Sequence, residues 1–280
     1  MQDTASKKPV LITGAYGLIG NLVYARLAAQ PEQYNVFGLA KNSAPSARTA
    51  AMQVTEIPDE CLRLADVSDF DAVARAVAGM HTVIHLAAEP DSRAGWESVL
   101  ANNIIGAHNV FEAARLAGVK RVIFASTNQV VFGYRAEAAY QALLSGRLDE
   151  VDLATLRRID HTQPTRPLSD YGCSKVFGEA LAHMYAYTHG LSCLCLRIGW
   201  VVADDRVPAG RGPTLWCSQR DIVQLVERCL DAPDSLRFDV FFGQSDNRYN
   251  FVDLEHARQV LGYAPQDSAE HPLVGQDMTR

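Results

Sequence analysis

The chain has 280 residues, of which 48% are hydrophobic, and its formal net charge is -6. This apolar content is enough for the core of one large α/β domain, and a mildly acidic chain without a basic face does not suit a nucleic-acid-binding protein. Thr13, Gly14, Gly17 and Gly20 interrupt the first apolar stretch, so we expect neither a signal peptide nor a membrane span. The six cysteines form no CxxC pair, and we expect buried free thiols in a cytoplasmic protein.

Strand-like apolar runs alternate with helix-period segments along most of the chain. Strands are expected at 10–12, 36–40, 62–64, 82–86, 121–125 and 192–198, and helices at 21–29, 73–78, 99–117 and 172–188. The alternation predicts a Rossmann-type α/β fold, a doubly wound parallel sheet with helices on both faces. Residues 1–202 are predicted to be a dinucleotide-binding domain with an insertion at 134–166. Residues 203–280 are expected to form a small substrate-binding cap packed against it.

Three glycines lie between the first strand and the first helix, in the order Gly14, Gly17 and Gly20. In a strand-to-helix turn, such glycines permit a tight bend, close approach of the backbone to a pyrophosphate, and packing of the helix on the sheet. The amides at the helix N-terminus would then face the phosphates. We therefore expect a nicotinamide dinucleotide to bind at Gly14, Tyr16, Gly17, Leu18, Ile19 and Gly20.

The residue after the second strand bears on the choice between NAD and NADP. NAD-binding proteins usually carry an acid there to bind the ribose hydroxyls, whereas this chain has Lys41, followed by Arg48. Cations suit the 2′-phosphate of NADP. The sequence favours NADP slightly and leaves NAD open, because Lys41 can equally be a solvated surface residue.

Several motifs together resemble a known family. The glycine loop, Asp66-Val67, His85-Leu86-Ala87-Ala88 and Tyr171-x-x-x-Lys175 are similar to extended short-chain dehydrogenases/reductases of the NAD-dependent epimerase/dehydratase group, over nearly the whole chain. Within that group, residues 124–128, 197–199, 216–218 and 262–268 resemble uronate dehydrogenases and related sugar dehydrogenases. The departures are Lys41 in place of an Asp, Gln129 in place of a His, and a longer 134–166 insertion.

The resemblance implies further site residues and a homodimer built from two helices of each subunit. The cofactor contacts that it adds are Asp66, Val67, Leu86, Ala87, Ala88, Asn103 and Ile198, and the substrate contacts are Thr127, Asn128, Gln129 and Arg211. For Asn103 and Arg211 the alternative is an ordinary solvent-facing residue. Arg211 stands five residues before Trp216, and its planar guanidinium would suit a substrate carboxylate or phosphate.

Tyr171, Lys175 and Thr127 form the predicted catalytic group. Tyr171 and Lys175 are four residues apart at the start of a helix and so share one face. A nearby ammonium should lower the pKa of the phenol, so that Tyr171 can take a proton from a substrate hydroxyl while hydride leaves for the nicotinamide. Thr127 would hydrogen-bond the reacting oxygen. Two alignments of the strand end disagree by one residue, and the other places Asn128 in that role.

These residues favour an NAD(P)-dependent oxidoreductase acting on a sugar or sugar acid, and a short cap suits a monosaccharide-sized substrate. The alternative is an epimerase or dehydratase that keeps NAD tightly bound through its cycle. A non-enzymatic protein on the same fold is a third possibility, but the chain retains both Tyr171 and Lys175. The histidines show no metal-binding motif, and His85 is expected to be a packed, hydrogen-bonded residue.

Overall fold

A computed structural model describes residues 7–271, and a single sheet of seven parallel strands runs through it. The strand order is β3-β2-β1-β4-β5-β6-β7, so the chain reverses its direction of winding between β1 and β4. The carboxyl ends of the strands at such a reversal form the crevice in which doubly wound folds bind ligands. The strands are β1 (Lys8–Thr13), β2 (Tyr34–Ala40), β3 (Leu62–Leu64), β4 (Thr82–His85), β5 (Arg121–Thr127), β6 (Ser192–Ile198) and β7 (Phe238–Gly243).

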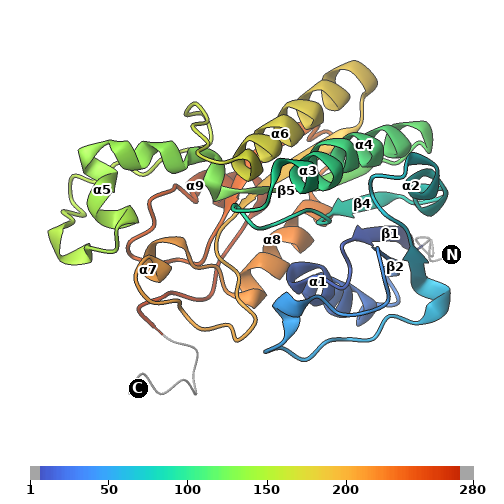
Figure 1. Ribbon diagram of the computed structural model, residues 1–280, viewed down its shortest axis with the longest axis horizontal. Helices are drawn as coiled ribbons and strands as arrows, with labels where there is room; N and C mark the ends of the chain where they lie inside the picture. The colour runs from blue at the N-terminus through green and yellow to red at the C-terminus, as the bar shows by residue number, and fades with distance from the viewer. Residues whose placement is uncertain (1–6, 272–280) are drawn as a thin grey trace, which may run out of the picture.

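Helices cover both faces of the sheet (Figure 1), which confirms the predicted Rossmann-type architecture. Helices α1 (Leu18–Ala28) and α8 (Gln219–Asp231) pack together on one face, and α2 (Phe70–Val77), α4 (Gly106–Leu116) and α6 (Asp170–His189) cover the other. Successive residues of a strand pack into the hydrophobic cores on opposite faces of the sheet: Val83 packs under α4, whereas Ile84 packs under α1. Because both faces are buried, the strands read as continuous apolar runs rather than alternating ones. Within residues 7–271, no helix combines the length and apolar character that a membrane span requires.

The helix expected at 99–117 consists of three consecutive pieces. It begins with α3 (Trp96–Val99), continues as a π-helical segment (Leu100–Ile105) and ends with α4. A π segment inserts an extra residue into the turn and is frequent at functional sites. Here it directs Asn103 toward Glu89 and Ser174, with which its side chain forms hydrogen bonds of 2.7–3.1 Å. Hydrophobic periodicity cannot reveal such a local change of pitch.

The segment after Ala203 differs from the expected cap. Strand β7 pairs in parallel with β6, and α8 packs against α1, so both belong to the main sheet and its helical layer. The alternation of helix and strand therefore continues past residue 203 after one long loop. Of residues 203–271, the loops, α7 (Gly212–Leu215) and α9 (Glu255–Leu261) are left to form a cap.

The insertion at 134–166 is closed at its base by two short backbone hydrogen bonds. The Gly133 amide donates to Arg166 O, and the Arg166 amide donates to Val130 O, both at 2.7 Å. Its helix α5 (Ala138–Leu144) packs through Tyr140 and Leu143 into a third hydrophobic cluster that includes Leu215 of α7. The insertion is therefore held beside α7, at the carboxyl edge of the sheet (Figure 1).

Candidate active site

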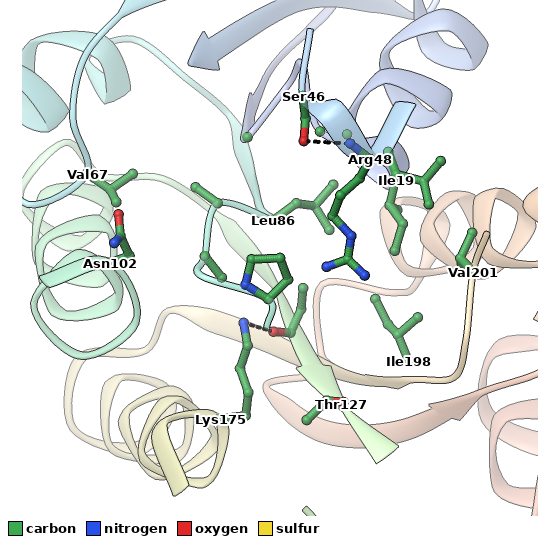
Figure 2. Close-up of a pocket in the computed structure, with 18 of the residues that line it drawn as sticks. Ile19, Ser46, Arg48, Val67, Leu86, Asn102, Thr127, Lys175, Ile198 and Val201 are labelled. Atoms are coloured by element: carbon green, nitrogen blue, oxygen red, sulfur yellow. Dashed lines mark hydrogen bonds between the residues drawn. The ribbon is translucent and has the colours of Figure 1, made fainter. Parts of the chain in front are cut away.

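A cavity of about 550 Å³ lies along the carboxyl ends of β1, β2, β4, β5 and β6. The glycine loop and the group of Thr127, Tyr171 and Lys175 both line it. Figure 2 shows Ile19 of the glycine loop on one side of the cavity and Thr127 and Lys175 on the other. An elongated cavity across the reversal point of the sheet is the shape that a dinucleotide requires.

The glycine loop has the geometry of a pyrophosphate cradle. Gly14 adopts a φ of 70°, which side chains other than glycine rarely tolerate. At Gly20 a Cβ would lie 2.1 Å from Gly14 O, so the helix can approach the loop only because glycine stands there. The N-cap of α1 is Gly17, with no side-chain cap, so the first amides of the helix are left for a ligand. These residues fit a nicotinamide dinucleotide.

Two cations of the segment that follows β2 line the cavity, and Lys41 stands where the adenosine half of a dinucleotide would bind. Lys41 Nζ is 2.8 Å from the carboxylate of Asp66, and this contact lowers the pKa of Asp66 to about 2. Arg48 lies in the following loop, and Figure 2 shows its guanidinium extending into the cavity. Lys41 is thus partly neutralised, whereas Arg48 presents its charge to the interior of the cavity.

Lys175 is fixed by close packing of α6 on β5. Ser169 caps the helix by accepting a hydrogen bond from the Gly172 amide, which places Tyr171 in the first turn and Lys175 in the second. At Gly178 a Cβ would lie 2.1 Å from the Phe124 ring, so only glycine allows this approach. As a result, Lys175 Nζ reaches Ala125 O at 2.8 Å and lies 5.7 Å from the centre of the Tyr171 ring.

The electrostatics differ from the expectation that Lys175 makes Tyr171 acidic. Burial raises the pKa of Tyr171 above its ordinary value, while a hydrogen bond with Thr127 and the charge of Arg48 oppose the increase. Burial also lowers the pKa of Lys175 to about 7. The ammonium is directed at a backbone carbonyl rather than at the phenol, so in this structure desolvation outweighs its attraction for a phenolate.

His85 has the packed role that the sequence suggested. Its Nδ1 lies 2.8 Å from Thr13 Oγ1, and that oxygen also accepts hydrogen bonds from the Leu86 and Ala87 amides. Burial, followed by the charge of Lys175, lowers the pKa of His85 to about 3, so the ring is neutral at physiological pH. It shapes the backbone at the end of β4.

A buried ion pair supports the end of β5 from below the cavity. Glu179 accepts hydrogen bonds from Arg197 Nε at 2.9 Å and Arg197 Nη2 at 2.8 Å, and from Ser126 Oγ at 2.5 Å. The side chains of Arg197 and Glu179 are only 4% and 9% exposed. The pair fixes Ser126 on the α6 side, so the next residue, Thr127, points toward the cavity.

Most of the predicted site residues line this one cavity. They are Gly14, Gly17, Leu18, Ile19, Gly20, Lys41, Asp66, Val67, Leu86, Ala87, Ala88, Thr127, Gln129, Tyr171, Lys175 and Ile198.

Four predicted residues lie outside the cavity lining. The Tyr16 side chain is buried, with its hydroxyl accepting from the Ile57 amide, and Asn103 holds Glu89 and Ser174 instead of facing a ligand. Asn128 is fully buried, and it is Thr127 that lies beside Tyr171, so the geometry favours Thr127 for contact with the reacting oxygen. Arg211 lies over the Trp200 ring, 5.3 Å from its centre.

Several further residues that were not predicted as site residues line the cavity. Asn102 reaches the cavity through the π segment, and Pro90 follows β4. Gly199, Trp200, Val201 and Val202 follow β6. The position of this last group directly after a buried strand was a usable signal, because the carboxyl ends of parallel strands meet at one edge.

Comparisons with known proteins agree with this geometry. Residues 10–255 match the model of the NAD dependent epimerase/dehydratase family. The chain is 34% identical to an NAD-dependent glucose-6-phosphate dehydrogenase of Haloferax volcanii, over 97% of this chain and 98% of the relative. It is also 34% identical to an L-arabinose 1-dehydrogenase (NAD(P)(+)) of the same organism, over 93% and 97%.

A similar solved structure is the uronate dehydrogenase of Agrobacterium tumefaciens, as a Y136A mutant complexed with NAD. The TM-score is 0.73 with 30% identity, and the alignment covers 95% of this chain and 87% of that one.

Proposed function

Because the chain belongs to the NAD-dependent epimerase/dehydratase family, we propose that it is an NAD(P)-dependent dehydrogenase that oxidises a sugar or sugar acid. The observation that carries this proposal is the single cavity, with a pyrophosphate cradle at one end and Thr127, Tyr171 and Lys175 at the other. A dinucleotide bound along it would have its reactive ring beside the phenol.

The mechanism assigns each of the three residues one task. The cofactor, when bound, supplies the hydride acceptor. Tyr171, as the phenolate, takes the proton of the substrate hydroxyl during oxidation, and as the phenol it returns that proton during reduction. Thr127, whose hydroxyl both donates and accepts hydrogen bonds, lies next to Tyr171 and orients the reacting oxygen. Lys175, anchored on Ala125 O, keeps a protonatable amine beside the phenol and the cofactor ribose.

The named relatives act on glucose 6-phosphate, L-arabinose and, in the solved structure, uronate, all of monosaccharide size. A substrate of this size suits the end of the cavity formed by Thr127, Gln129 and Trp200. Arg211, stacked on Trp200, is placed to meet an acidic group if the loop that carries it turns toward the substrate.

We propose further that NADP binds more tightly than NAD. Support comes from two cations that line the cavity: Lys41, at the end of β2 where NAD-binding proteins usually carry an acid, and Arg48 in the segment after β2. Calorimetric titration with both cofactors tests this. Lys41→Asp should invert the preference, and a wild-type protein that binds NAD more tightly would contradict the proposal.

A homodimer in the cytoplasm completes the proposal. Leu116 of α4 and Tyr187 of α6 are 60% and 61% exposed, and the two helices lie side by side on one face (Figure 1). Large apolar side chains exposed on adjacent helices favour an interface. All six cysteines are free, which suits a reducing compartment. A monomer in sedimentation analysis would contradict the dimer.

The activity is tested with a panel of aldoses, sugar phosphates and uronic acids, each with NAD and NADP, by following the absorbance of the reduced nicotinamide. At least one pair should react, and Tyr171→Phe should lose about 10²–10⁴-fold in rate while cofactor affinity stays near wild type. No reduction across the panel, together with copurified NAD, would favour an epimerase instead.

A further inference from the structure

Away from the cavity, two histidines and a carboxylate come together from three distant parts of the chain. His161 lies in the insertion, Asp239 in β7 and His256 in α9. One ring nitrogen of each histidine and one oxygen of Asp239 lie within 4.8 Å of one another. The two imidazoles are stacked, with centroids 3.6 Å apart and planes inclined by 13°.

We propose that His161, Asp239 and His256 bind a divalent transition metal ion, with Zn²⁺ as the best fit, and that this ion fastens the insertion to the edge of the sheet. Two imidazoles and one carboxylate form a ligand set that zinc prefers, at bond lengths of about 2.0–2.2 Å. All three residues are half-buried, which leaves a fourth position for water.

Two of the three ligand residues already contact each other, and Asp239 Oδ1 also accepts a hydrogen bond from the Val240 amide. His256 Nε2 lies 2.8 Å from Asp239 Oδ1, and a metal would replace the proton shared between them. Within residues 7–271, His161 Nδ1 is buried without a hydrogen-bond partner. A buried nitrogen without a partner destabilises the protein, and a metal ion bound to Nδ1 would supply one.

The charges around the cluster permit a cation. Asp160 and Asp239 are the acidic groups that act on His161, and Arg197 is the nearby basic residue. The charge of Arg197 is already balanced by Glu179. Phe241 stacks on His256 and fixes the plane of its ring.

The location indicates a structural role rather than a catalytic one. Asp239 lies four residues before Gly243, the residue that pairs with Ile198 at the cavity, and this is roughly 13 Å along the strand. Strand β7 is an edge of the sheet. Beside it, Ile159 of the insertion exchanges backbone hydrogen bonds of 2.9 Å with Phe251 and Asp253. A metal at His161 would add a further link between the insertion and the edge of the sheet.

The test uses the full chain, stripped with EDTA and kept reduced, and titrated with Zn²⁺ by calorimetry. We expect one site per chain whose affinity falls by about tenfold or more in His161→Gln and in Asp239→Asn. His189→Gln, a change of an exposed histidine at the end of α6, is the matched control and should bind like wild type. Since free cysteines can also bind Zn²⁺, the difference between the variants is the deciding quantity.

Trypsin gives a second readout, because Arg157 and Arg158 are exposed in the insertion close to His161. Zn²⁺ should slow cleavage there in the wild type and not in His161→Gln. Equal Zn²⁺ affinity in the wild type and His161→Gln, or a wild-type cleavage rate that Zn²⁺ does not change, would overturn the proposal. The cluster would then be only a hydrogen-bonded contact between the insertion and the sheet. Unchanged NAD(P) affinity in the variants shows that they are folded.

Discussion

Substitution of Glu179 by Gln should destabilise the protein severely, because it leaves the Arg197 charge buried without its partner. The two side chains are 9% and 4% exposed, and Glu179 accepts three hydrogen bonds, two of them from Arg197. Breaking a buried pair by removing one charge costs about 3–5 kcal/mol. For a domain of this size, about 2–4 °C of melting temperature is lost per kcal/mol, so Tm should fall by roughly 6–20 °C.

The assay is thermal and urea unfolding of Glu179→Gln beside a matched control. Glu150→Gln makes the same chemical change in an exposed pair with Arg147, whose side chains are 54% and 45% exposed, and it should cost less than about 1 kcal/mol. Replacing both Glu179 and Arg197 by Met should recover most of the loss, because neither charge is then buried alone. If Glu179→Gln loses no more stability than Glu150→Gln, the reasoning about the buried pair is refuted.

Three further predictions concern the cavity. Gly20→Ala should weaken NAD(P) binding by about tenfold or more in a fluorescence titration, because its Cβ would lie 2.1 Å from Gly14 O. Gly95→Ala, a change at a glycine with open space around it, is the control and should bind NAD(P) like the wild type. Equal affinities of the two variants would contradict the pyrophosphate cradle. Because burial raises the pKa of Tyr171, kcat/KM for oxidation should keep rising with pH from neutral toward about 10. A plateau of kcat/KM at neutral pH would argue against Tyr171 as the base. Thr127→Val removes the hydrogen bond that opposes this rise, so the pH at which kcat/KM levels off should move further upward. A lower rate with an unchanged pH profile would leave Thr127 with a purely steric role.

The sequence alone was sufficient for the features that depend on local order. Glycines between a strand and a helix, apolar runs that alternate with helix-period segments, and a Tyr and a Lys one turn apart each follow from neighbouring residues. Because a parallel sheet places every strand's carboxyl end at one edge, these motifs predicted the fold and the two ends of the cavity.

Tertiary structure decided what depends on burial and on contacts between distant segments. The direction of the Tyr171 pKa shift follows from desolvation, which no spacing of residues reveals. Likewise, Asn103 meets Glu89 and Ser174 only through a change of helical pitch, and His161 meets His256 only because the insertion folds back on the sheet edge. Periodicity reports which side of an element is apolar, whereas electrostatics depend on every group that packing brings near.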